Sequence, residues 1–167
     1  MLHQRSYQSN LGKITLLSND YYLLGLWFAE QKYYGAHYNL EQADNVVSQP
    51  LSLAVNWLND YFAGRNPDPA AIPIKLDVTP FRQKVLGELQ KVPYGQTVTY
   101  KELSHCLQAG QTNKVNQAQA IGGAVGHNPL TLIIPCHRVI GSDGSLTGYA
   151  GGIERKRALL RLERQTS

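Results

Sequence analysis

The chain has 167 residues, of which 43% are hydrophobic and 17% are charged, a composition typical of a globular protein with a hydrophobic core. Its apolar runs are short and interrupted, which argues against a bilayer-spanning helix, and the first residues lack the apolar block of a signal peptide, which favours the cytoplasm. The formal net charge of +4 is uneven: residues 1–80 carry 5 Lys/Arg and 7 Asp/Glu, whereas residues 81–167 carry 11 and 5. A basic second half indicates a polyanionic partner, first of all nucleic acid, although a solvated helix face over residues 154–164 would give the same pattern.

The first quarter of the sequence predicts an antiparallel meander. The stretch "SYQSNLGKITLLSNDYYLLGLWFAE" holds apolar-rich runs separated by turn residues at 10–12 and 18–20. Ser48 and Pro50 then indicate the start of a helix, and Gly64 its end. Apolar residues recur along this helix at helical spacing, namely Ala54, Trp57, Leu58, Tyr61 and Phe62. We interpret this stripe as packing against the sheet, without a chemical role.

The middle of the chain predicts a linker followed by helices. Residues 65–80 contain four of the eight prolines and are typical of a linker, with Thr79 and Pro80 suited to cap the next helix. "TYKE" at 99–102 has the spacing of a capping box, and after a polar loop at 108–117 the residues 118–126 form another predicted helix. Helix, turn and helix in a basic segment are the organisation of many DNA-binding proteins, and also of plain helical domains.

Two adjacent glycines interrupt the last of these predicted helices. Gly122 and Gly123 each cost about 1 kcal/mol relative to alanine inside a helix. Their small size allows a backbone to come close to another helix or to DNA, and the sequence alone does not choose between the two.

The two cysteines differ in their surroundings. No Cys-x-x-Cys spacing exists and the histidines are scattered, so zinc is not expected, and a reducing compartment would keep both thiols free. Cys136 is followed directly by His137, which could take the thiol proton, because the thiolate is the nucleophile. Adjacent side chains of an extended segment point to opposite faces, so contact needs a bridging water or a bend. A carboxylate at Glu154 or Glu163 could orient the imidazole, while the alternative is a buried structural cysteine.

Five segments together resemble one family. "IPCHRVIG" at 134–141 is similar to the active-site signature of the O6-alkylguanine-DNA alkyltransferases, also called methylated-DNA–protein-cysteine methyltransferases. Three longer segments match the same family in the same order, and the N-terminal part matches in layout, ending in "LNDYFAG". The longer segments are "FRQKVLGELQKVPYGQTVTYKEL" at 81–103, "AIGGAVGHNP" at 120–129 and "GYAGGIERKRALLRLE" at 148–163. The match covers most of residues 79–164.

The resemblance implies an α+β fold. It predicts an N-terminal α/β domain over 1–72 with a small antiparallel sheet, ribonuclease H-like, a linker at 73–80, and a mostly helical, winged helix-turn-helix-like domain over 81–167. The implied function is DNA repair by direct reversal, an irreversible, single-turnover transfer of the alkyl group of O6-alkylguanine to Cys136 after base flipping. No cofactor is expected, because the alkylated base is the donor. The implied partner is double-stranded DNA that carries the lesion, and no membrane association is expected. The protein is expected to be a monomer in solution, and O4-alkylthymine is a candidate second substrate.

The resemblance also assigns catalytic roles. Cys136 would accept the alkyl group, and His137 would act as the base through water, oriented by Glu163. Asn128 would help to hold the active-site turn, and Tyr100 would give a proton or a hydrogen bond to the departing guanine.

Further positions are assigned to the substrate and to the framework. In this family the second helix enters the minor groove, where the paired glycines would permit close approach. Arg138 would brace the interface between the two parts of the chain. The residues assigned to the substrate are Val139 through its backbone, Ser142, Tyr149, Gly122, Gly123 and Gln119.

Two features depart from the family pattern. Gln119 stands where family members usually carry an arginine that fills the gap left by the flipped base, and the loop at 108–117 is longer than usual. Both bear on DNA binding and flipping and leave the transfer chemistry intact. No cysteine precedes Cys106, so the structural zinc of some relatives is not expected.

Two other functions compete with alkyl transfer. One is a lesion sensor that binds alkylated DNA without transfer, but relatives of that kind lack the cysteine found here at Cys136. The other is a thiol hydrolase that uses Cys136 and His137 on a soluble ester or amide, against which the charge of the second half and the predicted helix-turn-helix argue. The mass of the protein after mixing with O6-methylguanine DNA would separate all three.

Overall fold

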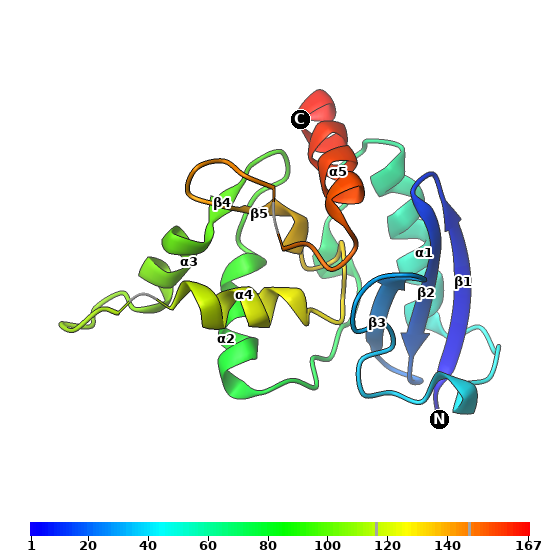
Figure 1. The fold of residues 1–167 in the computed structure, drawn as a ribbon. Coiled ribbons are helices and arrows are strands. Elements are labelled where there is room, and N and C mark those ends of the chain that lie inside the picture. The colour runs from blue at the N-terminus through cyan, green and yellow to red at the C-terminus, as the bar shows by residue number, and fades with distance from the viewer. Residues whose placement is uncertain (116, 147) are drawn as a thin grey trace.

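The structure is a computed structural model that describes residues 1–115, 117–146 and 148–167. A sheet and one long helix form the N-terminal part, helices dominate the C-terminal part, and the last helix lies beside both (Figure 1). This confirms the expected α+β organisation. The elements in chain order are β1 (His3–Ser9), β2 (Gly12–Ser18), β3 (Leu23–Phe28), η1 (Leu40–Gln42), α1 (Gln49–Phe62), η2 (Pro69–Ala71), α2 (Pro80–Leu89), β4 (Val98–Thr99), α3 (Tyr100–Leu107), α4 (Ala118–Gly126), η3 (Cys136–Arg138), β5 (Val139–Ile140) and α5 (Ile153–Thr166).

The N-terminal sheet is the predicted meander. β1, β2 and β3 pair antiparallel in that order, and the β1–β2 turn uses Gly12 at a φ of 119°, which favours glycine. α1 begins as predicted, with the Ser48 hydroxyl accepting a hydrogen bond from the backbone N–H of Leu51 at 3.3 Å. Its apolar stripe packs on the sheet within the main core, and Gly64 follows its end at a φ of 77°.

The free edge of β3 carries two later segments of the chain. β3 is an edge strand, and an exposed edge would leave backbone groups unpaired. Leu23 pairs with Ile74 of the proline-rich segment, and Leu26 pairs with Leu130, through hydrogen bonds such as Leu26 N–H to Pro129 O at 2.8 Å. The segment predicted as a linker therefore lies along the sheet, and so does the chain that leads to Cys136.

The C-terminal part is built on three mutually packed helices, α2, α3 and α4. Thr79 caps α2, and Thr99 caps α3, where its hydroxyl accepts from the backbone N–H of Glu102 at 3.0 Å and donates to Oε1 of the same residue at 3.1 Å. α3 and α4 form the predicted helix-turn-helix. Asn116, in the loop between them, lies outside the described residues.

A short parallel pair, β4 with β5, brings the two halves of the site together. Val98 pairs with Val139, and Thr99 pairs with Ile140. Because β4 leads directly into α3 and β5 directly follows η3, this pairing places Tyr100 close to the segment that carries Cys136. A strand pair of only two residues each has no recognisable sequence pattern, and it was not predicted.

α5 joins both parts of the molecule. Arg155 donates from Nε to the carbonyl of Leu11 at 2.8 Å, and its guanidinium lies 4.6 Å from the ring centroid of Phe28. No helix among the described residues combines the length and the apolar character that crossing a membrane requires.

Candidate active site

Cys136 lies in a tightly held turn. It opens η3 after a buried segment, and the residue is 4% exposed. The side chain of Asn128 spans the turn: its Nδ2 donates to the carbonyl of Ile134 at 2.9 Å, and its Oδ1 accepts from the backbone N–H of Leu130 at 3.0 Å. Asn128 is itself 3% exposed, so water does not compete for these bonds. The nucleophile candidate thus has a fixed backbone.

The backbone at Cys136 is a 3-10 turn and not the extended segment that the sequence argument assumed. A 3-10 helix has about three residues per turn, so consecutive side chains diverge by about 120° and do not point to opposite faces. Pro135 precedes the turn with a ψ of 66°, which bends the chain there. As a result the imidazole of His137 reaches α5, and its Nε2 lies 2.5 Å from Oε2 of Glu163.

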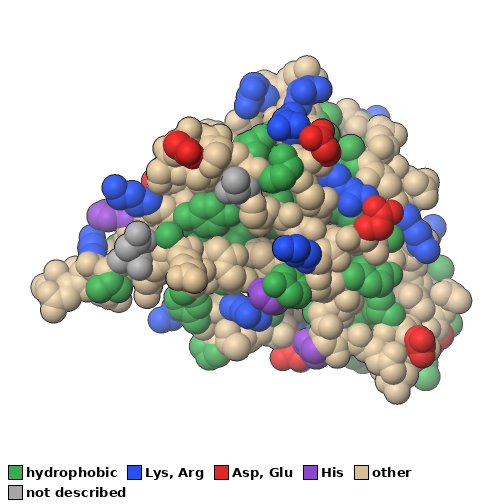
Figure 2. Space-filling view, in the orientation of Figure 1, with side chains coloured by type: hydrophobic (Ala, Val, Ile, Leu, Met, Phe, Trp, Pro, Cys, Tyr) green, Lys and Arg blue, Asp and Glu red, His purple; other side chains and the backbone are tan. Residues whose placement is uncertain are grey.

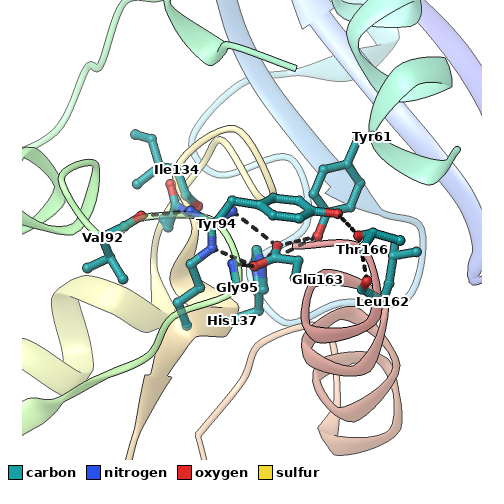
Figure 3. Close-up of polar contacts among 11 residues, drawn as sticks. Tyr61, Val92, Tyr94, Gly95, Ile134, His137, Leu162, Glu163 and Thr166 are labelled. Atoms are coloured by element: carbon teal, nitrogen blue, oxygen red, sulfur yellow. Dashed lines mark hydrogen bonds and ion pairs between the residues drawn. The ribbon is translucent and has the colours of Figure 1, made fainter. Parts of the chain in front are cut away.

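The Glu163 carboxylate is the centre of a buried hydrogen-bond cluster (Figure 3). Oε1 accepts from Nε of Arg138 at 2.8 Å and from the backbone N–H of Gly95 at 3.3 Å. Oε2 accepts from the hydroxyl of Tyr61 at 2.6 Å and from Nη2 of Arg138 at 3.1 Å, in addition to its contact with His137. His137 and Glu163 are both 0% exposed, so this cluster is screened from solvent.

The pKa values of these groups define the resting protonation state. Burial raises the pKa of the Cys136 thiol to about 11, against the opposing effects of the Asn128 hydrogen bond and the Lys156 charge. Burial lowers the pKa of His137, although its bond to Glu163 acts in the other direction. Burial would raise the pKa of Glu163, but His137 and Arg138 outweigh it and hold that pKa well below its usual range. At neutral pH the site therefore holds a thiol, a neutral imidazole and a carboxylate.

This state fixes the tautomer of His137. The neutral ring carries one proton, and the carboxylate at 2.5 Å requires it on Nε2. Nδ1 is then an acceptor, and among the described residues it has no protein partner. A neutral nitrogen with a free lone pair beside a cysteine is suited to accept the thiol proton.

A second buried charge faces the same turn. Lys156 in α5 is 1% exposed, and it lies two turns before Glu163 on the buried face of the helix. Burial lowers its pKa to about 8, opposed by the attraction of a Cys136 thiolate. Its positive charge in turn favours the thiolate.

Two tyrosines, Tyr100 and Tyr149, lie close to the thiol. Burial, and then the charge of a Cys136 thiolate, raise the pKa of Tyr100, so its phenol stays protonated and can donate. Its hydroxyl is so near Gly148 that a Cβ built there would lie 3.0 Å away. Tyr149 is 8% exposed, and among the described residues its buried hydroxyl has no hydrogen-bond partner. Val139 is fully buried in β5.

A groove of about 310 Å³ opens beside these residues, with Tyr149 in its wall. α4 lines one side through Gly122, Gly123 and Gly126, and the segment 148–153 lines another. Figure 2 shows this face: the acidic side chains in view lie away from α4, where uncharged and apolar surface dominates, with basic residues around it.

The paired glycines of α4 are not required by packing within the chain. A Cβ at Gly123 would meet no atom within 4 Å, and one at Gly122 would meet only Tyr100, at 3.9 Å. Of the two uses that the sequence left open, close approach of another helix therefore has no support here. Gln119, also on α4, is exposed in its first turn.

Three other residues lie away from the catalytic cluster. Ser142 is exposed on the turn 141–145 and does not line the groove. Glu154, one of the two carboxylates considered for orienting His137, is exposed and pairs with Arg157 at 2.9 Å. Cys106 is an exposed free thiol on α3. Among the described residues no group of His, Cys, Asp and Glu is arranged to hold a metal ion.

Two family models cover nearly the whole chain. Residues 2–76 match the ribonuclease-like domain of 6-O-methylguanine DNA methyltransferase, and residues 80–165 match its DNA binding domain. The chain belongs to the 6-O-methylguanine DNA methyltransferase family. The resemblance inferred from the sequence is thus confirmed.

Individual family members match this chain over most of their own length. The curated methylated-DNA–protein-cysteine methyltransferase of Mycobacterium tuberculosis H37Rv is 41% identical over 166 residues, 98% of this chain and 93% of that protein. The Haemophilus influenzae protein of the same name is 36% identical over 98% of this chain and 87% of its own. The crystal structure of M. tuberculosis OGT in complex with DNA has a TM-score of 0.83 at 40% identity, covering 99% of this chain and 94% of that one.

Sequence reasoning missed two buried residues near Cys136 and His137. Tyr61 was interpreted as part of an apolar stripe, and Lys156 as part of a charged helix face. Arg138, expected to brace the interface between the two parts of the chain, contacts Glu163 and the carbonyl of Val92 at 2.7 Å. It also lines a cavity together with Trp57 and Tyr61 of α1. The spacing of Lys156, Leu159 and Glu163 on one helix face was the available signal for a buried lysine.

Proposed function

We propose that this protein repairs DNA by direct reversal, accepting the alkyl group of O6-alkylguanine on Sγ of Cys136. The observation that carries the proposal is the buried thiol next to a neutral His137 whose Nε2 is held by Glu163, in a chain of this family. The substrate is the lesion in double-stranded DNA, and the acceptor is used once. The N-terminal unit at 1–72, the linker at 73–80, the monomeric state and the cytoplasmic location remain parts of this proposal.

The chemical step is a substitution at the alkyl carbon. Nδ1 of His137 takes the thiol proton, through a water molecule, and Glu163 stabilises the imidazolium that results. The thiolate attacks the alkyl carbon, the S–C bond forms, and the C–O6 bond breaks with its electron pair moving to guanine. Tyr100 donates a hydrogen bond or its proton to the departing guanine anion, and the proton held by the His137 imidazolium then passes through water to the Tyr100 phenolate or to the base. The net proton movement is therefore from Sγ to guanine, with His137 and Tyr100 returned to their starting states.

The buried position of Cys136 requires the base to come to the thiol. A guanine stacked in a duplex cannot reach a residue that is 4% exposed, so the nucleotide must rotate out of the helix at a cost of a few kcal/mol. We propose that the base enters by the groove beside Tyr149, which α4 lines with glycine. In this proposal Tyr149 and the backbone of Val139 receive the base, Ser142 reaches it from the exposed turn at 141–145, and Gln119 approaches the gap that the base leaves.

The product explains why the protein acts once. An S-alkylcysteine is a thioether with no bond that water readily cleaves, and the other cysteine, Cys106, lies exposed on α3. No cofactor takes part, because the lesion itself supplies the alkyl group.

Mass spectrometry with excess O6-methylguanine duplex tests the proposal. We expect each protein molecule to gain one methyl group, located on Cys136 by peptide mapping, and demethylation to stop at one equivalent. Cys136→Ser should keep its fold and its DNA binding and gain no methyl group. Continued turnover would favour a thiol hydrolase, and binding without any mass change would favour a lesion sensor; either result would refute the proposal.

A further inference from the structure

The N-terminal part of the chain contributes one polar side chain to the catalytic cluster, that of Tyr61 on α1. Resting on the proposed alkyl transfer, we propose that Tyr61 is a positioning residue of that reaction, whose hydroxyl orients and partly neutralises the Glu163 carboxylate that holds His137. Tyr61 does not touch the thiol or the groove. It acts through Glu163, across the boundary between the two parts of the molecule (Figure 3).

The Tyr61 hydroxyl and the His137 imidazole contact the same oxygen of Glu163. The Tyr61 hydroxyl lies 2.6 Å from Oε2 of Glu163, and Nε2 of His137 lies 2.5 Å from that same atom. The hydroxyl and Nε2 are 3.5 Å apart, so both groups converge on Oε2 from adjacent directions. Tyr61 is 1% exposed, which means that no bulk water can replace the hydroxyl as a donor.

The hydroxyl can only be a donor to this carboxylate. Burial, and then the negative charge of Glu163, raise the pKa of Tyr61 well above its usual value, so the phenol keeps its proton. A carboxylate oxygen accepts and has no proton to give, which fixes the direction of the bond. Charge-assisted bonds of this kind are stronger than neutral ones.

Packing alone does not account for a tyrosine at this position. The ring stacks on Trp57 at 5.2 Å between centroids and meets Phe62 edge-on at 5.4 Å, contacts that a phenylalanine would make equally well. A buried hydroxyl is unfavourable unless it finds a partner. The oxygen to which it donates belongs to Glu163, the residue that orients the proposed base.

A donor on Oε2 weakens the pull of Glu163 on the imidazole. Each hydrogen bond to the carboxylate draws negative charge away from the oxygen that faces His137. Without the phenol, Glu163 stabilises the imidazolium more strongly, and His137 becomes protonated at a higher pH. The other ionisable groups around this pair are Cys136, Arg138, Tyr149 and Lys156.

The pH profile of Tyr61→Phe measures this effect. Transfer from free O6-benzylguanine in a single turnover needs neutral His137, so the rate falls in acid as the ring protonates. We expect the acid limb of Tyr61→Phe to move upward by about one pH unit, the size of shift that loss of one bond to a charged group corresponds to. The ring of ¹⁵N-labelled His137 should titrate at correspondingly higher pH by NMR.

Tyr94→Phe is the matched control. The Tyr94 ring lies 6.1 Å from that of Tyr61, and its hydroxyl contacts Oγ1 of Thr166 at 2.6 Å and not Glu163. This variant removes a phenol oxygen close to the Glu163 cluster but outside it, and it should leave the acid limb and the His137 titration unchanged. If Tyr61→Phe melts at a lower temperature but also leaves both unchanged, Tyr61 is a packing residue and the inference is wrong.

The role of Tyr61 can be tested even if the wild type is inactive or if Tyr61→Phe does not fold. If wild-type protein gains no methyl group from O6-methylguanine duplex, the proposed function fails, while the NMR titration of His137 still decides the role of Tyr61. If Tyr61→Phe does not fold, 3-fluorotyrosine at position 61 replaces it, because its more acidic phenol is a stronger donor that keeps the bond. The acid limb and the titration should then move to lower pH, and no movement would overturn the inference.

Discussion

Replacing Glu163 by glutamine preserves the shape of the side chain while removing its charge. Oε1 and Oε2 together accept from four groups, all of them donors: Tyr61, Gly95, His137 and Arg138. An amide NH₂ must therefore face a donor on whichever side it takes. Glu163→Gln cannot satisfy the cluster in either orientation.

The cost to stability follows from the charge left behind. The Arg138 side chain is 11% exposed and loses the only carboxylate that it contacts among the described residues. Breaking a buried ion pair in this way costs about 3–5 kcal/mol, which at about 2–4 °C per kcal/mol corresponds to a fall in melting temperature of about 6–20 °C.

The destabilisation should depend on pH in a defined direction. The folded chain lowers the pKa of Glu163, so this carboxyl binds its proton more weakly in the folded than in the unfolded state. Its contribution to stability is complete above the unfolded pKa of about 4.3 and is lost as the pH falls towards the folded value. The gap in melting temperature between wild type and Glu163→Gln should therefore be widest near neutral pH and narrow in acid.

The cost to the reaction follows from the tautomer. With NH₂ at the Oε2 position, Nε2 of His137 becomes an acceptor, and the ring proton moves to Nδ1, where the thiol proton should go. In serine proteases, an Asp-to-Asn change that fixes the wrong tautomer of the catalytic histidine lowers the rate about 10⁴-fold. We therefore expect Glu163→Gln to lower the transfer rate by about 10²–10⁴.

The rate should be measured with free O6-benzylguanine, at a temperature at which the variant is fully folded. Glu154→Gln is the control, because this carboxylate stands on the same helix with its side chain 88% exposed. Its melting temperature and rate should match those of the wild type. A folded Glu163→Gln that transfers at the wild-type rate would refute the view that Glu163 sets the tautomer of His137.

Gly123→Ala should stabilise the protein by about 1 kcal/mol, because a Cβ there meets no atom, yet it should slow repair in duplex DNA. A Cβ at Gly87 in α2 also meets no atom, so Gly87→Ala should stabilise the protein without slowing repair. If both variants repair duplex DNA at the same rate, Gly123 does not serve the close approach of DNA. Gln119→Arg should speed duplex repair and steepen the salt dependence of binding by about one phosphate contact, leaving the rate with free O6-benzylguanine unchanged, and equal effects on both rates would exclude a role in flipping. Iodoacetamide at neutral pH should label exposed Cys106 before Cys136, and earlier labelling of Cys136 would contradict its buried, protonated state.

Local sequence signals predicted the elements but not all of the site. Turn residues, the caps at Ser48, Thr79 and Thr99, and Gly64 act over a few residues, and the structure has each where it was expected. The helix predicted at 118–126 has those bounds, although the side chain of Gln117 at its N-cap makes no capping hydrogen bond. Turns, helix caps and helix ends can be predicted from the sequence because residues close to one another in the chain determine them.

Tyr61 and Lys156 show why the rest could not be predicted. The spacing of Tyr61 on its helix reports only that the face is buried, and its hydroxyl partner lies 102 residues further along the chain. Lys156 belongs to a charged run whose outer members are exposed, so composition suggested a solvated face, whereas α5 buries it together with Glu163. The pairing of glutamate with histidine was itself carried by the resemblance, since the residues alone left Glu154 equally eligible.

The resting state of the thiol is suited to a protein that reacts once. With a pKa of about 11, Cys136 is ionised to about one part in ten thousand near pH 7, and it is 4% exposed. Soluble electrophiles and oxidants react with accessible thiolates, so a permanently ionised Cys136 would be lost to them, and its thioether would not be recovered. In the proposed mechanism the proton stays on sulfur until the base is bound, which ties ionisation of the thiol to the presence of substrate. Nδ1 of His137, whose ring is held by Glu163, would then accept that proton during transfer.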